Sequence, residues 1–300
     1  MYALAALKET AVLLESGLGV NCVYSPRGES LVCAVDGSLF VHQVVEGLGY
    51  TGITAVNAAS DLVVSYLTEG SVAHSTDVKT GECLRLLDLE SGKYTRVFSG
   101  HTSEVYSLSS CCTTKRMLSC AENEILLWDQ RMKEAVGKIP AVGHSLAKYS
   151  PDDASVITVL FKEKCEMKLF DARSYTTGPY ATKELDIDGE WLDMCYSWSG
   201  HTVALSTPEA LVLLDGIKGS LLGYLPTEYA RIRAFSPDDD YLVYSREEGV
   251  LSVCTANNLK DVTEISVGGP VSFVDFNPGY DQLVVVGQKV SLWQVNSENE

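Results

Sequence analysis

The chain has 300 residues and a net charge of −17 at neutral pH, from 23 basic and 40 acidic residues. A protein that held nucleic acid through its phosphates would work against this charge, so we expect no direct DNA or RNA binding. The 46% of hydrophobic residues predicts a large core and argues against disorder. No apolar run approaches the ~18 residues that a membrane span needs, so we expect no membrane partner.

Motifs for catalysis and cofactor binding are missing from the sequence. Nine cysteines show no CxxC pair and no zinc-ligand spacing, and five histidines are too scattered for a metal cluster. There is no G-x-S-x-G elbow, P-loop, H-E-x-x-H motif or dinucleotide fingerprint. We therefore expect no catalytic residue, no metal and no cofactor, and we expect the thiols to be small buried side chains in a reducing compartment.

One stretch, from Gly100 to Asp129, has the outline of a single propeller blade. It opens with Gly-His, closes with Trp-Asp and holds two β-rich runs between them. We expect Gly100 to allow a tight turn, His101 to hydrogen-bond toward the next strand, Trp128 to fill space between sheets and Asp129 to begin a turn. One blade cannot bury both of its faces, so the rest of the chain should repeat it.

The repeat is found in chain order at the position of Trp128. Seven matching positions are separated, by subtraction, by 45, 41, 42, 44, 40 and 39 residues. They predict an all-β, seven-bladed WD-repeat β-propeller that occupies residues 1–300 as a single domain. The positions are His42, Leu87, Trp128, Phe170 (followed by Asp171), Leu214, Cys254 and Trp293.

Turn signals agree with this register in most blades. Proline presets a turn that Asp or Gly completes, and short β-branched runs follow each turn. Ser197-Trp198-Ser199-Gly200 replaces the Ser-Pro turn of the fifth blade, and residues 69–80 are expected to form an exposed loop or an irregular extension in the second. The clearest turns are Ser25-Pro26, Ser150-Pro151, Ser236-Pro237 and Asn277-Pro278.

The two ends of the chain have separate predicted roles. Lys8 and Glu9 interrupt the apolar opening, which also lacks a basic region, so it does not read as a signal peptide. We expect residues 1–15 to pair with the last blade as its outer strand and to close the ring, because closure removes an open sheet edge. Residues 296–300 are expected to be a tail.

Partner-binding candidates come from the register. Residues that enter the inner strands should rim the central mouth, and aromatic and Arg anchors dominate binding hot spots, which favours Trp191 and Arg231. The alternative is that all of them are plain solvent-facing or packing positions. The set is Glu104, Tyr106, Trp191, Arg231 and Arg233.

The stretch from Met167 to Thr182 reads MKLFDARSYTTGPYAT and resembles a particular family. A blade that ends in Asp-x-Arg-Ser, followed by Gly-Pro-aromatic-Ala-Thr, resembles the WD-repeat subunit shared by COMPASS histone methyltransferases and PNUTS/protein phosphatase type one complexes. Three further stretches fall in the same order, and the similarity runs from about residue 12 to the C-terminus. They are Val20 to Glu29, Lys93 to Val105, and Glu190-Trp191 with Tyr196-Ser197.

The resemblance implies a divergent, non-catalytic scaffold in the nucleus. It would bind a short segment of a PNUTS-like scaffold or a Set-type methyltransferase and act in RNA polymerase II transcription termination and chromatin modification. Direct contact with the phosphorylated polymerase tail stays open. Arg173, Tyr175 and Tyr180 either contact the partner or lock the connection between the fourth and fifth blades.

Two other functions compete with this interpretation. One is a WD-repeat adaptor of an unrelated assembly, such as a ubiquitin-ligase substrate receptor. The other is a propeller-fold enzyme, which would require His and carboxylate groups that converge in the central channel.

Overall fold

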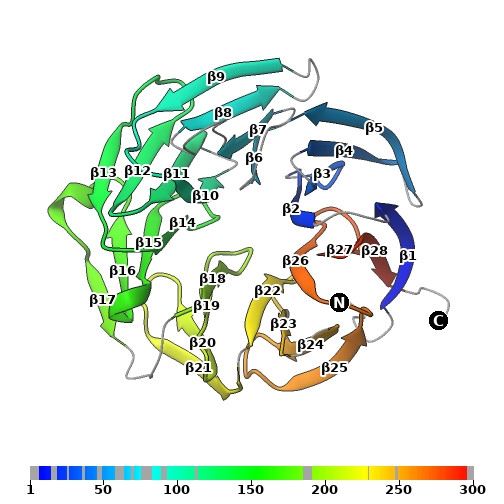
Figure 1. Cartoon of the computed structure of the whole chain (residues 1–300). Coiled ribbons are helices and arrows are strands. Elements are labelled where there is room, and N and C mark those ends of the chain that lie inside the picture. The colour runs from blue at the N-terminus through cyan, green and yellow to red at the C-terminus, as the bar shows by residue number, and fades with distance from the viewer. Residues whose placement is uncertain are drawn as a thin grey trace.

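The computed structural model describes residues 7–14, 19–25, 27–35, 38–45, 49–57, 64–68, 71–75, 83–88, 93–111, 114–184, 191–228, 230–246 and 249–295. Within these ranges the strands form seven four-stranded sheets in which neighbouring strands run antiparallel. The sheets follow one another around a centre (Figure 1). The prediction of an all-β propeller is confirmed.

The first three sheets come from the N-terminal half. Their strands are β2 (Gly19–Tyr24), β3 (Ser30–Val35), β4 (Ser38–Val45) and β5 (Gly49–Asn57); β6 (Val64–Thr68), β7 (Ser71–Ser75), β8 (Cys83–Asp88) and β9 (Lys93–Ser99); and β10 (Val105–Cys111), β11 (Arg116–Ala121), β12 (Glu124–Asp129) and β13 (Gly137–Pro140).

The next three sheets repeat this order, with two short 3-10 helices in the fourth. Their elements are β14 (Ser145–Tyr149), β15 (Val156–Phe161), η2 (Lys162–Lys164), β16 (Glu166–Asp171), η3 (Tyr175–Thr177) and β17 (Ala181–Glu184); β18 (Asp193–Tyr196), β19 (Thr202–Ser206), β20 (Ala210–Asp215) and β21 (Leu221–Pro226); and β22 (Arg231–Phe235), β23 (Tyr241–Ser245), β24 (Val250–Thr255) and β25 (Asp261–Ser266).

The last sheet joins distant parts of the chain. It contains β26 (Val271–Phe276), β27 (Gln282–Gly287), β28 (Val290–Val295) and, at its outer edge, β1 (Leu7–Leu14). β1 pairs with β28 antiparallel, with Leu7 opposite Val295 and Val12 opposite Ser291. The inner strands β2 and β26 also lie side by side, so the first and last sheets are neighbours (Figure 1).

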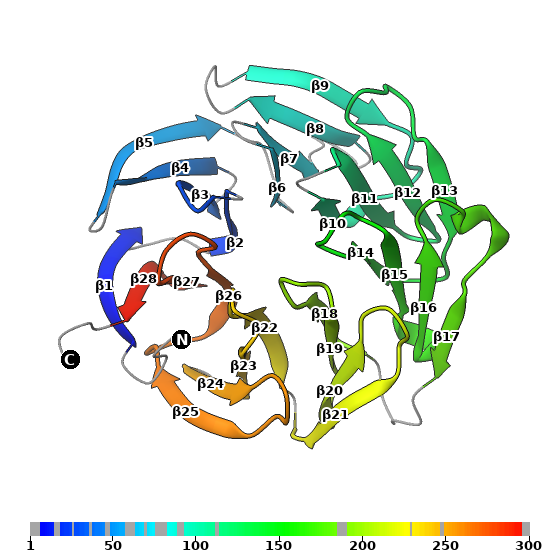
Figure 2. The ribbon, with the colours of Figure 1, turned by 180° about the vertical axis from the view of Figure 1, so that it is seen from behind.

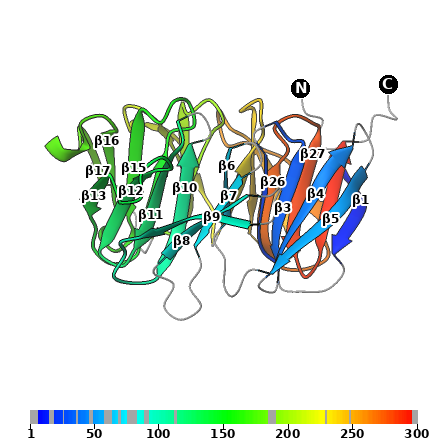
Figure 3. The same ribbon diagram turned by 90° about the horizontal axis from the view of Figure 1, so that it is seen from above.

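The innermost strand of every sheet is β2, β6, β10, β14, β18, β22 or β26, as the view from behind also shows (Figure 2). Seen edge-on, the strands cross the thickness of the disc (Figure 3). Each of the seven repeat positions lies on the third strand of its sheet counted from the centre. Trp128, Phe170 and Leu214 are paired there with the apolar residues Met117, Ile157 and Val203.

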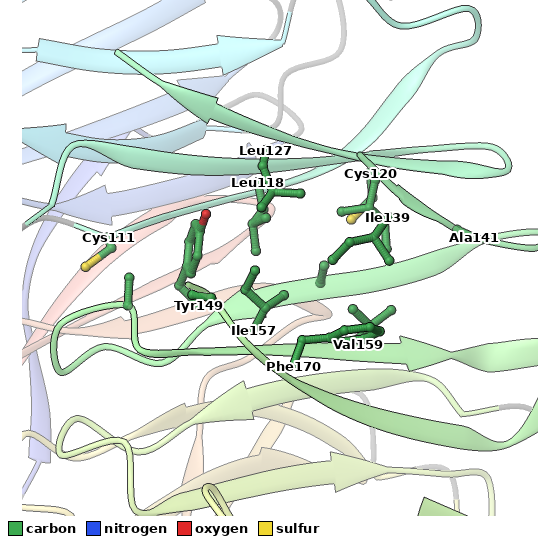
Figure 4. Packing of buried hydrophobic residues seen from close by; sticks show 14 of the residues in the cluster. Cys111, Leu118, Cys120, Leu127, Ile139, Ala141, Tyr149, Ile157, Val159 and Phe170 are labelled. Carbon is green, nitrogen blue, oxygen red and sulfur yellow. The ribbon is translucent and has the colours of Figure 1, made fainter. Parts of the chain in front are cut away.

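The core lies between neighbouring sheets. Leu118 and Leu127 of one sheet pack against Tyr149 and Ile157 of the next (Figure 4). Further clusters follow between other neighbours, such as the one that joins Val243 of β23 to Leu283 of β27. Since both faces of a sheet must be covered, each blade depends on the blades beside it.

Residues 69–80 were expected to form an exposed loop or an irregular extension, but Ser71–Ser75 is the regular strand β7, which pairs with β6 and β8, so that part of the prediction is wrong. The rest of that segment, residues 1–6 and the tail 296–300 lie outside the described residues.

Candidate protein-interaction sites

The best-formed blade contains a buried chain of hydrogen bonds. Trp128 Nε1–H donates to Ser119 Oγ at 2.7 Å, and Ser119 Oγ lies 2.5 Å from His101 Nε2. His101 Nδ1 lies 3.0 Å from Glu124 Oε1, which also accepts from the Thr102 amide at 3.1 Å. Since Ser119 already accepts from the indole, it can donate to His101, and a neutral imidazole then satisfies every partner.

Burial favours the same neutral form of His101. Desolvation lowers the pKa of the imidazole, although the neighbouring Glu124 carboxylate acts in the opposite sense. Glu124 has a lowered pKa: burial alone would raise it, but the hydrogen bonds from Lys138, Thr102 and His101 outweigh that effect. The role predicted for His101 as a blade residue therefore fits its surroundings.

The other blade residues also hold turns or fill space. A Cβ at Gly100 would lie 3.2 Å from the Trp128 ring, a tight contact that the indole could relieve only by shifting. Asp129 accepts from Arg131 Nε at 2.8 Å, and that interaction lowers the Asp129 pKa to about 2. Phe170 is buried, Asp171 accepts from the Arg173 amide at 2.8 Å, and Trp293 Nε1 donates to Ser291 at 3.0 Å.

Two of the expected rim residues join neighbouring inner strands. Tyr106 Oη on β10 lies 2.6 Å from the amide of Ser145, the first residue of β14, and donates to the carbonyl of Ser145 at 2.8 Å. Arg233 on β22 donates to the carbonyls of Val271 and Ser272 at 2.6 and 2.7 Å, where β26 begins. Both side chains are therefore engaged in hydrogen bonds between neighbouring sheets.

Of the three remaining rim candidates, two are exposed and one is buried. Glu104 and Arg231 are exposed beside the starts of β10 and β22. Trp191 is 0% exposed and packs with Val203, Leu205 and other residues of the core, so its expected place on the rim is wrong. The segment before β18 turns the indole into the space between two sheets, which a sequence register does not reveal.

The segment from Arg173 to Tyr180 contacts both neighbouring sheets. Tyr175 Oη donates to the carbonyl of Val136 in the preceding blade at 3.3 Å, and Tyr180 Oη donates to that of Ile217 in the following one at 2.8 Å. These contacts fit the interpretation that the tyrosines lock the connection. Tyr180 nevertheless keeps 50% of its surface exposed.

An outer groove is built on the same segment. It has a volume of about 460 Å³ and is lined by residues of the fourth and fifth blades, namely Ser155, Val156, Asp171, Arg173, Ser174, Tyr180 and Ile217. Ile217 is 51% exposed and forms its apolar side with Tyr180. Among the described residues, the Arg173 guanidinium has no hydrogen bond or ion pair.

A second hollow, the channel-end cavity, lies where the inner strands end. Its volume is about 300 Å³, and its walls come from the ends of β14, β18, β22 and β26. Trp198 forms one side, is 38% exposed, and is fixed by Nε1 donating to the Phe235 carbonyl at 3.1 Å. Other lining residues are Lys148, Tyr149, Pro151, Tyr196, Arg233, Phe273 and Asp275.

The pKa values of two charged groups in this cavity are shifted by their surroundings. Burial raises the pKa of Asp275 to about 7, against the amides of Tyr24 and Phe276 and the charge of Lys148, which act to lower it. Burial also lowers the pKa of Arg233. Within the described part of the chain, the Lys148 ammonium forms no hydrogen bond or ion pair.

Sequence reasoning placed one of these residues, Arg233, among the candidates and missed the others. A signal was present for Trp198, since it replaces the proline of a turn that most blades share. Nothing in the sequence pointed to Lys148, because an isolated lysine on a strand does not show which face of the sheet it occupies. Within the described ranges no cluster of His, Cys, Asp and Glu could hold a metal, and no helix is long and apolar enough to cross a membrane.

These features define the class of protein. Residues 92–129 match the family model described as "WD domain, G-beta repeat", and the sheets around them repeat its four strands. The chain is a WD-repeat β-propeller.

Particular relatives extend this over the whole chain. It is 28% identical over 306 residues to "WD repeat-containing protein 82" of Drosophila melanogaster, across 98% of this chain and 96% of the relative. It is 22% identical over 235 residues to "COMPASS component SWD2" of Saccharomyces cerevisiae, across 70% of each chain. An uncharacterized WD repeat-containing protein of Schizosaccharomyces pombe is 22% identical across 97% of this chain and 96% of its own length. These similarities support a divergent relative of this WD-repeat group, in agreement with the resemblance at Met167 to Thr182.

Proposed function

We propose that the protein is a non-catalytic scaffold in a nuclear complex, either a COMPASS-type histone methyltransferase or a PNUTS/protein phosphatase type one complex. It would act in transcription termination by RNA polymerase II and in chromatin modification. The observation that carries the proposal is similarity to WD repeat-containing protein 82 across nearly the whole chain, supported by the match to a COMPASS component.

The architecture supports a scaffold because it presents many turns at fixed positions without needing a catalytic centre. We take each four-stranded sheet as one blade, which gives seven blades in one domain, and β1 as the strand that closes the ring. Closure couples every blade to its neighbours. Deletion of residues 1–15 should therefore lower the melting temperature of the entire domain, and a truncated protein that melted like the intact one would refute the closed ring.

The Arg173–Tyr180 segment supports the choice of partner class. It carries the strongest resemblance to the family, and it combines exposed Tyr180 in the outer groove with a guanidinium that has no hydrogen bond or ion pair within the described part of the chain. Arg and Tyr side chains of this kind are common anchors in protein interfaces.

Affinity purification of the tagged protein, followed by mass spectrometry, tests the proposal. Methyltransferase subunits, or a phosphatase together with its large scaffold, should be recovered in proportion to the tagged chain. The affinity tag expressed alone is the control for nonspecific recovery. Recovery of ubiquitin-ligase subunits instead would favour the adaptor of an unrelated assembly.

A further inference from the structure

The outer groove and the channel-end cavity open on the same face of the disc. Neighbouring strands run antiparallel, so the turns after the first and third strands of every sheet lie on one side. We call this side the cavity face; it carries residues 150–155, 172–180, 197–201 and 216–220. Glu104 and Arg231, at the starts of inner strands, lie on the opposite face.

The two hollows are also neighbours on that face. Pro151 lines the cavity, while Ser155 at the end of the same turn lines the groove. Tyr196 lines the cavity, and its hydroxyl lies 3.5 Å from the carbonyl of Gly216, the residue before groove-lining Ile217. Only a short stretch of surface therefore separates the two hollows.

Two cations line the hollows on this path, Lys148 in the cavity and Arg173 in the groove. Several nearby acids are occupied: Asp152 accepts from Ser150 and Ser155, and Asp239 accepts from the amides of Trp198 and Ser199. In contrast, the ammonium of Lys148 in the cavity and the guanidinium of Arg173 in the groove have no hydrogen bond or ion pair among the described residues. A chain with a charge of −17 thus places two cations beside exposed aromatic rings.

The charge of Asp275 does not cancel the positive charge of Lys148 in the cavity. Two backbone amides already bind its carboxylate, and a pKa of about 7 leaves it only partly ionised at neutral pH. Arg233 adds positive charge to the same wall, although the strand carbonyls use its donors.

We propose that the cavity face binds one extended acidic segment of a protein partner, with an apolar side chain in the channel-end cavity against Trp198 and carboxylates paired with Lys148 and Arg173. This deepens the scaffold function and rests on it. The apolar anchor gains from burial against Trp198 and Phe273. A half-buried lysine without a hydrogen bond gains from a further opposite charge brought into its hollow, so the carboxylates of the partner supply specificity.

A displayed library of random extended peptides, selected on the full-length protein, tests the proposal without knowledge of the partner. Selected peptides should share an aromatic or large aliphatic residue flanked by Asp or Glu. Isothermal titration of a selected peptide should give binding weakened about 30-fold by Trp198→Ala and about tenfold by either Lys148→Met or Arg173→Ala. Lys148→Met keeps the apolar stem, so it separates lost charge from lost packing.

Glu104→Ala and Arg231→Ala on the opposite face are the matched controls and should leave affinity unchanged. Unchanged melting temperatures of all variants would show that lost binding is not lost folding, and Trp198→Phe should restore most of the affinity. The proposal is overturned if no peptide is selected, if selected peptides lack acidic residues, or if Arg231→Ala weakens binding while Trp198→Ala does not. Peptide binding as expected, together with a purification that recovers neither assembly, would retain this docking face and reject the proposed complex.

Discussion

The sheets β10–β13 and β18–β21 have the same strand order but are held together in different ways. In the first, the indole of Trp128 is tied through Ser119 to His101 and Glu124. In the second, Leu214 takes the place of the tryptophan, and Trp191 fills the core from the segment before β18. Trp191 Nε1 and the hydroxyl of Ser206 are buried there without a partner among the described residues.

The difference shows that the polar chain is one way to hold a blade and not a requirement for it. Apolar packing against neighbours is enough for β18–β21, because both faces of the sheet are covered. The unusual features of that region lie on its surface, where Trp198 and Ile217 face the two hollows. The blade that best matches the repeat is thus the least informative about function.

The largest expected effect comes from removing the central indole of the polar chain. Trp128→Ala should lower the free energy of unfolding by about 3–5 kcal/mol, since it deletes a fully buried side chain and leaves a cavity. Urea denaturation measures this. A loss below about 1 kcal/mol would mean that Trp128 does not organise its sheet.

A matched pair of serine variants sharpens the comparison. Ser119→Ala should cost about 2–3 kcal/mol, because it leaves both the Trp128 N–H and His101 Nε2 unsatisfied in the core. Ser206→Ala, on the second strand of the other sheet, should cost almost nothing, because its buried hydroxyl has no partner to lose. Equal costs for the two variants would contradict the contrast between the sheets.

The pH dependence of stability reports on Asp275 in the channel-end cavity and not on the polar chain of either sheet. The folded pKa of Asp275 lies near 7, above its ordinary value of 3.8, so the folded state holds the proton more tightly. Protonated Asp275 therefore makes its full contribution to stability below about pH 3.8, and this contribution is lost as the pH rises through about 7. Asp275→Asn should gain stability relative to the parent between about pH 5 and about pH 8, by at least the ~1.4 kcal/mol that one pKa unit represents. Parallel pH profiles in urea denaturation would contradict this.

The smallest effect concerns the two indole N–H groups. Trp128→Phe should cost about 1 kcal/mol more than Trp191→Phe, because only the first removes a hydrogen bond. Thermal melting of the two variants beside the parent measures the difference. A larger cost at Trp191 would show that its N–H is bound in solution.

Much of the fold could be predicted because its signals are local. Turn residues and short β-branched runs place most strands, and the apolar residue on each third strand gives the register. The hydrogen bonds of His101 could not be predicted, because Ser119 and Glu124 meet it only after the sheet has formed. The same is true of Tyr106 and Arg233, whose partners lie 39 and 38 residues away in the next sheet.

The candidate site was predicted less well for a related reason. Which face a side chain occupies depends on the neighbouring sheet, so Trp191 was expected at the rim but lies in the core, while Trp198 was overlooked. Arg173 and Tyr180 were found through their resemblance to a family, and the outer groove around them became visible only with the fifth blade in place.

Site-specific photocrosslinking in the purified complex tests the central claim most directly. Benzoylphenylalanine is placed at position 198 on the cavity face or at position 104 on the opposite face, each in the tagged full-length protein. A covalent adduct with a subunit of the methyltransferase or phosphatase complex is expected from position 198 and not from position 104. An adduct from position 104 alone would contradict the account.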